Sequence, residues 1–370
     1  MKPGHFLASL ISRLIPRSRK TLVFTSFPDC TDNAYALYRY ITDNMPGKYR
    51  CIWLYTDKES VQKRNTVKGF YKYSIPAFYY FARARYVFGT HGIYDFLRFQ
   101  RKGKIVNLWH GMPLKVIGCM DPTTGGSNPA KADYLIATSP FFKEIMHKSF
   151  ENVEIDNVLL TGQPRNDLMF QPTPFFASRG IDRTAYRSIG IWLPTYRQSI
   201  IGDIRKDGIF NDSGISFLSM DDLVRLNAHL QATSSLLIVK LHPMDALQLT
   251  DFSHFSNLLI IKPTEFTEQL YPLLGACDYL LTDYSSVWID YCILKRPIGY
   301  VMNDIEEYRN SRGLTIENLD QALPGTIIDT YGKLIEFISN PPAFNCPHLA
   351  MFNTYCDNNA SKRIAQQLKL

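Results

Sequence analysis

The chain lacks any apolar run near the roughly 18–20 residues that a bilayer-spanning helix requires, so we expect no transmembrane segment. It also lacks a P-loop, a Gly-x-Gly-x-x-Gly turn between strand and helix, a His-Glu-x-x-His helix and a Gly-x-Ser-x-Gly elbow. No Cys/His cluster and no strand-end Asp-x-Asp pair offers metal ligands at a suitable spacing. These absences disfavour hydride transfer, zinc hydrolysis and serine hydrolysis, and we expect neither a metal site nor a bound cofactor.

Cysteine is sparse and charge is nearly balanced. The seven cysteines among 370 residues are scattered, and none forms a Cys-x-x-Cys pair. A disulfide framework is therefore not expected, and free thiols are typical of a reducing compartment. The formal net charge is only +7, without the dense Lys/Arg block of a nucleic-acid-binding protein. This mildly basic charge favours anionic partners, such as phosphates or acidic lipid, and does not indicate a dedicated nucleic-acid-binding protein.

Residues 1–20 combine apolar residues at helical spacing with positive charge and contain no acid. The apolar residues on one helical face are Phe6, Leu7, Leu10, Ile11, Leu14 and Ile15. The basic residues are Lys2, Arg13, Arg17, Arg19 and Lys20. Two interpretations fit this segment: an amphipathic helix at an anionic membrane surface, or a helix packed on the protein's own surface. The basic cluster favours the membrane, and hence a cytoplasmic protein bound peripherally at the inner face of the cell membrane.

Short apolar strands alternate with helices in both halves of the chain, which indicates buried parallel sheets in an α/β fold. The predicted strands are 21–27, 49–55, 86–89, 105–109, 134–138 and 158–161, then 189–194, 236–241, 258–261, 279–282 and 298–301. The polar, proline-bearing segment 171–186 separates the halves. We therefore predict two doubly wound, Rossmann-like domains facing across a cleft, at 21–172 and 187–345, followed by a helical tail at 346–370.

Two histidines stand at the ends of apolar runs, and each is followed at once by a residue that turns the chain. His110 precedes Gly111, and His242 precedes Pro243. The carboxyl edge of an open α/β sheet is where ligands bind, and imidazole is well suited to proton transfer near neutral pH. One histidine in each half indicates a site between two lobes. For His110 taken alone, a buried structural histidine beside Trp109 is an equally good interpretation.

Polar and basic side chains collect at the predicted carboxyl ends of strands in the second half. Asp283 follows an apolar strand, and Ser285 and Ser286 then open a helix whose N-terminus can bind an anion. The other candidates are Thr195, Arg197, Lys240, His242 and Arg312. Arginine offers a fork suited to phosphate oxygens, and lysine supplies a point charge. The group predicts a pyrophosphate pocket, although helix capping alone would also explain Asp283 or Ser285.

A series of short motifs follows the chain in a fixed order. They are Trp109–Lys115, Thr161–Asp167, Leu193–Arg197, Lys240–Pro243, Thr282–Ser286, Arg312–Leu314, Pro324–Gly325 and Tyr355–Ser361. This series resembles the CDP-glycerol glycerophosphotransferase family, whose members build teichoic acid and related poly(alditol phosphate) chains. The resemblance spans roughly residues 20–370. It implies a two-lobed GT-B-like fold, with a CDP-alditol donor in the C-terminal lobe and an acceptor in the N-terminal lobe.

The resemblance also implies roles for single residues. His110 would be the base, with Gly111 and Lys115 on the acceptor side, and His242 would contact the donor phosphates. Ser285 and Ser286 match the phosphate-binding helix start of the family. The chain departs from the family in two places: Met112 stands where members usually carry Thr, and Asp357–Asn359 replaces an Asp-Gly-Asn pattern. The first departure would alter the acceptor side.

These observations predict an enzyme that transfers an alditol phosphate from a CDP-alditol to a hydroxyl of a lipid-linked or polymeric acceptor. Glycerol phosphate, from CDP-glycerol, is the favoured unit. The acceptor hydroxyl, activated by His110, would attack the β-phosphorus and release CMP during synthesis of a teichoic-acid-like or capsular polymer. Two alternatives remain open: a GT-B glycosyltransferase that uses a nucleotide sugar, and a catalytically silent nucleotide-binding scaffold at the membrane. The released nucleotide distinguishes the first alternative, and any turnover excludes the second.

Overall fold

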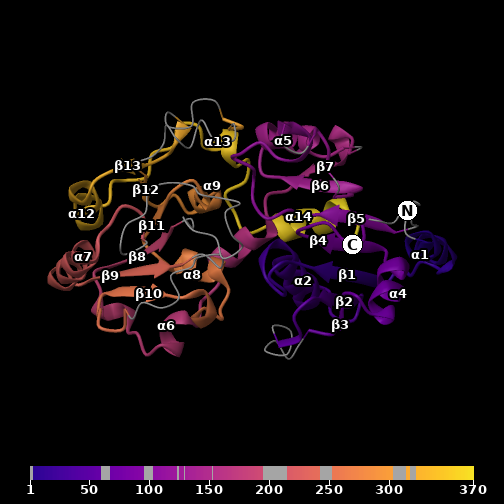
Figure 1. Cartoon of the computed structure of the whole chain (residues 1–370), viewed down its shortest axis with the longest axis horizontal. Coiled ribbons are helices and arrows are strands. Elements are labelled where there is room, and N and C mark those ends of the chain that lie inside the picture. The colour runs from indigo at the N-terminus through magenta and orange to yellow at the C-terminus, as the bar shows by residue number, and fades with distance from the viewer. Residues whose placement is uncertain are drawn as a thin grey trace. The chain divides into compact units, whose positions relative to one another are not determined.

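The protein is represented by a computed structural model that describes residues 3–59, 67–95, 103–122, 125–128, 130–151, 153–194, 215–241, 252–302, 314–316 and 322–370. The chain divides into two compact units (Figure 1). Unit 1 comprises Met1–Leu168 and Ala350–Leu370, and unit 2 comprises Met169–Leu349. The chain thus passes into unit 2 shortly before the segment 171–186, and most of the tail from 346 onward belongs to unit 1.

Unit 1 is built on a seven-stranded sheet in the order β3-β2-β1-β4-β5-β6-β7. All pairings between neighbouring strands are parallel. The strands are β1 (Thr21–Thr25), β2 (Arg50–Tyr55), β3 (Gly69–Tyr71), β4 (Tyr86–Gly89), β5 (Lys104–Asn107), β6 (Tyr134–Ala137) and β7 (Val158–Leu160). The helices are α1 (Pro3–Leu14), α2 (Asp32–Asn44), α4 (Ile75–Arg83), α5 (Pro140–Ser149), α13 (Leu349–Phe352) and α14 (Ala360–Gln367).

Successive strand residues in unit 1 belong to two different hydrophobic clusters because side chains alternate across a sheet. On β1, Leu22 and Phe24 pack in the cluster that includes residues of α2 and α14. Val23, which lies between them, packs with Ala77 and Phe81 of α4. Both faces of the sheet are therefore covered by helices, as the largely unbroken apolar strands predict.

Unit 2 contains a six-stranded, all-parallel sheet in the order β10-β9-β8-β11-β12-β13. The strands are β8 (Ser188–Leu193), β9 (Ser235–Lys240), β10 (Leu258–Ile261), β11 (Tyr279–Thr282), β12 (Ile298–Val301) and β13 (Thr326–Ile328). The helices are α6 (Phe175–Ser178), α7 (Met220–Ala232), α8 (Leu270–Ala276), α9 (Val287–Tyr291) and α12 (Tyr331–Ser339). Two doubly wound parallel sheets are thus observed, which confirms the predicted α/β class.

The C-terminal segment returns to unit 1 and is held there by buried contacts. Ile364 and Leu368 pack in the same cluster as α2 and β1. At the start of α14, the Asp167 carboxylate accepts hydrogen bonds from the backbone N–H groups of Ala360 (2.9 Å) and Ser361 (2.8 Å). An acidic side chain at a helix N-terminus satisfies donors that lack intrahelical partners. Asp167, from the Thr161–Asp167 motif, therefore fixes the tail on unit 1.

Within the described residues, no helix has both the length and the apolar character that crossing a bilayer requires.

Candidate functional site

Each sheet has one point where its strand order reverses, and ligands of open α/β sheets bind outside the carboxyl ends of the strands at such points. In unit 1 this point lies between β1 and β4, where Thr25 is the register partner of Gly89. In unit 2 it lies between β8 and β11, where Leu193 is the partner of Thr282. Functional side chains are therefore expected at these two edges.

His110 lies at the first of these edges, in the loop that follows β5. The strand ends at Asn107, two residues earlier than predicted, because the Asn107 side chain accepts a hydrogen bond from the Trp109 N–H (2.9 Å) and Trp109 adopts a φ of 49°. Gly111, which directly follows His110, has a φ of 138° and is buried. Only glycine adopts this conformation readily, so Gly111 lets the loop turn behind His110.

Asn33, in the first turn of α2, fixes the loop that carries His110. Its side-chain nitrogen donates hydrogen bonds to the carbonyl groups of Leu108 and Trp109, each at 3.0 Å. Its side-chain oxygen accepts a hydrogen bond from the backbone N–H of Arg165 at 3.1 Å. Asn33 is fully buried, so these bonds satisfy polar groups that water cannot reach.

Arg165 is the second anchor of the loop. Its Nη1 donates to the His110 carbonyl (2.9 Å) and to Asp32 Oδ1 (3.0 Å). The side chains of Arg165 and Asp32 are only 7% and 16% exposed, so the ion pair is poorly screened by water. Neither Asn33 nor Arg165 was a sequence candidate. Arg165 stands in the Thr161–Asp167 motif, which could have drawn attention to it, whereas nothing in the sequence distinguishes Asn33.

The hydrogen bond of the His110 ring indicates which nitrogen can accept a proton. Nδ1 lies 3.2 Å from the Thr90 carbonyl oxygen, which can only accept, so Nδ1 carries the proton and Nε2 holds the lone pair in the neutral ring. The residue is exposed to solvent, yet protein atoms crowd the ring, and this desolvation lowers its pKa. The Thr90 hydrogen bond and Asp32 oppose that shift. His110 is therefore suited to act as a base through Nε2 near neutral pH.

A second histidine, His91, lies against His110 and was also not predicted from the sequence. It follows β4, and its ring is stacked on that of His110 with centroids 4.6 Å apart and planes 7° apart. Burial, with a smaller contribution from His110, lowers the pKa of His91 to about 4. The edge of the unit 1 sheet thus presents a pair of neutral imidazoles.

The remaining acceptor-side candidates are less informative. Lys115 is half-buried and follows the same loop, and its predicted contact with an acceptor stays a prediction. Met112 is completely buried, so its side chain belongs to the core and does not line the edge beside His110.

In unit 2, Lys240 is the last residue of β9 and is half-buried. Its Nζ lies 5.0 Å from the ring centroid of Phe266 and 3.5 Å from the Leu241 carbonyl oxygen. Burial lowers the pKa of this ammonium group to about 8. Lys240 therefore remains mostly cationic at neutral pH, as a phosphate-binding residue must.

Asp283, Ser285 and Ser286 follow β11 at the same carboxyl edge, with β8 between β11 and β9. Asp283 is buried, whereas both serines are partly exposed. Ser286 occupies the N-cap position of α9, but its hydroxyl makes no capping hydrogen bond. Capping therefore does not account for Ser286, a partly exposed residue. The structure thus brings Lys240 and the Asp283–Ser286 segment to one edge of unit 2.

Four predicted donor-side residues, Thr195, Arg197, His242 and Arg312, lie outside the described residues. Their predicted contacts with phosphate stay predictions.

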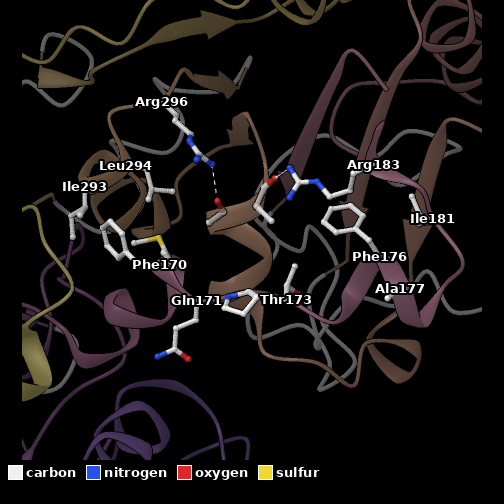
Figure 2. A pocket seen from close by; sticks show the side chains of 14 residues that line it. Phe170, Gln171, Thr173, Phe176, Ala177, Ile181, Arg183, Ile293, Leu294 and Arg296 are labelled. Atoms are coloured by element: carbon white, nitrogen blue, oxygen red, sulfur yellow. Dashed lines mark hydrogen bonds between the residues drawn. The ribbon is translucent and has the colours of Figure 1, made fainter. Parts of the chain in front are cut away.

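A large pocket in unit 2, of about 740 Å³, lies away from these candidates (Figure 2). Arg183 precedes β8 and Arg296 precedes β12, so the pocket lies at the amino edge of the sheet. Arg183 donates to the Ala276 carbonyl (2.6 Å), and Arg296 donates to those of Gly275 (2.8 Å) and Cys277 (2.6 Å), as Figure 2 shows in part. These guanidinium groups donate hydrogen bonds to carbonyl groups at the C-terminal end of α8, where a helix leaves carbonyls without intrahelical partners. The pocket is therefore not the predicted donor site.

Comparison with known proteins gives a family match over nearly the whole chain. The model of the CDP-Glycerol:Poly(glycerophosphate) glycerophosphotransferase family matches residues 7–370. The chain is 26% identical over 395 residues to the teichoic acid poly(glycerol phosphate) polymerase of Bacillus spizizenii, an alignment that covers 96% of this chain and 93% of that protein. It is 24% identical over 388 residues to the teichoic acid glycerol-phosphate transferase of Staphylococcus aureus, with 97% and 95% covered.

Solved structures show the same fold. The wall teichoic acid polymerase TagF matches with a TM-score of 0.75 at 21% identity, and the match covers 98% of this chain and 91% of that chain. The UDP-GlcNAc 2-epimerase of Methanocaldococcus jannaschii matches with a TM-score of 0.54 at 13% identity, covering 94% and 99%. These likenesses confirm the GT-B-like fold class.

Proposed function

Because the chain belongs to the CDP-glycerol:poly(glycerophosphate) glycerophosphotransferase family, we propose that it transfers an alditol phosphate from a CDP-alditol to an acceptor hydroxyl and releases CMP. Glycerol phosphate is the proposed unit, since the family description and both relatives named above concern glycerol phosphate. One TagF structure was soaked with CDPG, which supports the same class of donor for this chain.

The reaction is a displacement at phosphorus. Nε2 of His110 takes the proton of the acceptor hydroxyl, and the oxygen attacks the β-phosphorus of the donor. A bond forms between that oxygen and the β-phosphorus, and the bond from the β-phosphorus to the bridging oxygen breaks. CMP departs with the bridging oxygen. The single observation that carries this role is the hydrogen bond from His110 Nδ1 to the Thr90 carbonyl, which leaves Nε2 free to accept a proton.

The donor is proposed to bind at the carboxyl edge of unit 2. Negative charge builds on the phosphates and the leaving group during transfer, and fixed cations and hydroxyl donors stabilise it. Lys240, Ser285 and Ser286 come to this edge, and Lys240 is cationic at neutral pH. His242 and Arg312 are proposed to complete the donor site on the strength of their sequence positions.

The acceptor is proposed to be lipid-linked or polymeric, and the protein is proposed to reach it from an anionic membrane surface at the cytoplasmic face. Support comes from α1, which contacts α4 and buries small side chains. Ser9 and Ser12 are buried, and Ala8 packs on the hydrophobic cluster that includes residues of α4. The same helix leaves Leu10 and Leu14 exposed, at 43% and 74%. An amphipathic helix held in this way can insert its apolar side chains into a lipid interface.

The neighbouring helix, α4, also leaves apolar side chains exposed. Ile75 and Tyr79 lie four residues apart on α4, hence on one face, and are 87% and 41% exposed. Arg13 and Arg83, in the last turns of α1 and α4, add positive charge that favours anionic lipid.

One experiment tests the reaction. The purified protein is incubated with an acceptor analogue and a panel of CDP-alditols and nucleotide sugars, and the released nucleotide is identified. Release of CMP from CDP-glycerol is the expected result, whereas UDP or GDP from a nucleotide sugar would identify a glycosyltransferase instead. The proposal includes no metal or cofactor, so turnover should persist when EDTA is added.

A further inference from the structure

The stacked pair of His91 and His110 is built by two neighbouring strands. His91 follows β4 and His110 follows β5, and the last residues of these strands, Gly89 and Asn107, are register partners. The rings are 4.6 Å apart between centroids and inclined by only 7°. Because the two strands are hydrogen-bonded, the distance between the two loops is set by the sheet.

Thr90 is a buried residue that contacts both rings. Its carbonyl oxygen lies 3.2 Å from His110 Nδ1, and its hydroxyl lies 2.9 Å from His91 Nδ1. Thr90 itself is completely buried. A residue that contacts both imidazoles through different groups holds the orientation of each ring relative to the other, so the flat contact is a feature of the fold.

Burial keeps the pair neutral, although the negative charge of Asp32 favours a proton on either ring. His110 interacts with Asp32 and Arg165, and His91 interacts with Asp32, Lys72 and His110 itself. Two imidazolium rings at this separation would repel each other, and partial burial also disfavours their charged forms. Both histidines accordingly have lowered pKa values. Removing the ring of His91 would admit water to one face of His110 and make protonation of His110 easier.

We propose that His91 is a positioning residue for His110: its ring holds the plane of the base and excludes water from one of its faces. The inference rests on the proposed function, in which His110 takes a proton from the acceptor. His91 does not itself exchange a proton with the substrate. It acts by keeping Nε2 of His110 aimed and unprotonated.

The test compares His91→Ala, His91→Phe and the control His254→Ala, which removes an exposed histidine of unit 2. The protein has eight histidines, so His110 can be assigned in an NMR titration of the imidazole resonances by its loss in His110→Ala. In His91→Ala the pKa of His110 should rise by about half a unit or more, because desolvation is relieved. In His91→Phe, which keeps a ring in place, and in His254→Ala it should stay near the wild-type value.

The same variants are assayed for CMP release between about pH 5 and 9, a range that spans the titration of histidine. His91→Ala should lower kcat about tenfold, since a small misplacement of a base is costly, and should move the acid limb upward. His91→Phe should retain most of the turnover and the wild-type acid limb. If circular dichroism shows that His91→Ala does not fold, His91→Phe is compared with the wild type, and a shifted acid limb or a large loss of turnover in His91→Phe would overturn the proposal.

The two proposals fail in different ways. If the wild type releases no CMP from any CDP-alditol, the proposed function fails, and the titration alone then decides whether His91 controls the protonation of His110. If the wild type is active but His91→Ala leaves both the His110 pKa and the acid limb unchanged, the positioning role of His91 is overturned.

Discussion

Arg165 donates from Nη1 to the backbone carbonyl of His110 at 2.9 Å, so a residue 55 positions along the chain fixes the loop of the proposed base. The same nitrogen is 3.0 Å from Asp32 Oδ1. One guanidinium group therefore joins the start of α2, the loop after β5 and the Thr161–Asp167 motif. This arrangement gives the motif a structural role beside the proposed base, although none of its residues was assigned to the chemistry.

Arg165→Ala should therefore affect both stability and turnover. It removes one partner of a poorly exposed ion pair, which costs about 3 kcal/mol of unfolding free energy, and it releases the His110 loop. Urea denaturation and CMP release would measure the two effects. Arg39→Ala is the matched control, because the Arg39–Asp43 pair is about half exposed and should contribute under about 0.5 kcal/mol. Equal losses in both variants would contradict the anchoring role.

His110→Ala should depress turnover about a hundredfold or more, the scale expected when a general base is lost. Donor affinity should change little, because His110 belongs to unit 1 and the proposed donor residues to unit 2. Steady-state CMP release and calorimetric titration with CDP-glycerol would separate the two quantities. Turnover near the wild-type value would rule out His110 as the base.

The sequence predicted His110 because local signals mark it: an apolar strand, then histidine, then a glycine that turns the chain. The parallel sheets were predicted for the same reason, since unbroken apolar strands are visible in short windows. The anchors were not predicted, because they depend on long-range contacts: Asn33 bonds to Trp109, 76 positions away, and Asp167 bonds to Ala360, 193 positions away. His91 was not predicted from the sequence because only the order of strands in the sheet places its loop beside that of His110.

The donor site can be tested by binding alone. Removing the hydroxyls of Ser285 and Ser286, or replacing His242 or Arg312 by Ala, should weaken CDP-alditol binding, because each change removes a proposed phosphate partner. Calorimetry in the His110→Ala background avoids turnover during the titration.

Ser256→Ala is the matched control for the serine variants, because Ser256 is an exposed serine of unit 2 outside the proposed site. It should bind the donor as tightly as the parent does. Unchanged affinity in all four site variants would show that this edge of unit 2 does not hold the phosphates.

Donor affinity should also depend on pH through Lys240. Its pKa is lowered to about 8 by burial, so the side chain is cationic below that pH and loses its charge as the pH rises through it. Binding of an anionic donor should therefore weaken between pH 7 and 9, about one unit on either side of this pKa. Lys240→Met should bind the donor weakly at all these pH values and lose the dependence. A Lys240→Met profile that parallels the wild type would assign the titration to another group.

The membrane proposal can be tested without removing α1. Deleting residues 1–20 would uncover the face of unit 1 on which Ser9 and Ser12 are buried, so a loss of vesicle binding could reflect damage to the fold. Substitution of exposed side chains avoids this problem. Leu10→Glu with Leu14→Glu removes outward apolar groups and adds negative charge, and the buried face stays intact.

This double variant should lose co-sedimentation with phosphatidylglycerol-containing vesicles and keep CMP release with a water-soluble acceptor analogue. The wild type should bind such vesicles less tightly as salt is raised, because each basic residue near the surface contributes about 1 kcal/mol by an interaction that salt screens. Val224→Glu, at an exposed apolar position of unit 2, is the control and should bind like the wild type. If the double variant co-sediments as well as the wild type does, α1 is a packing element alone, and the protein must reach its acceptor by another surface.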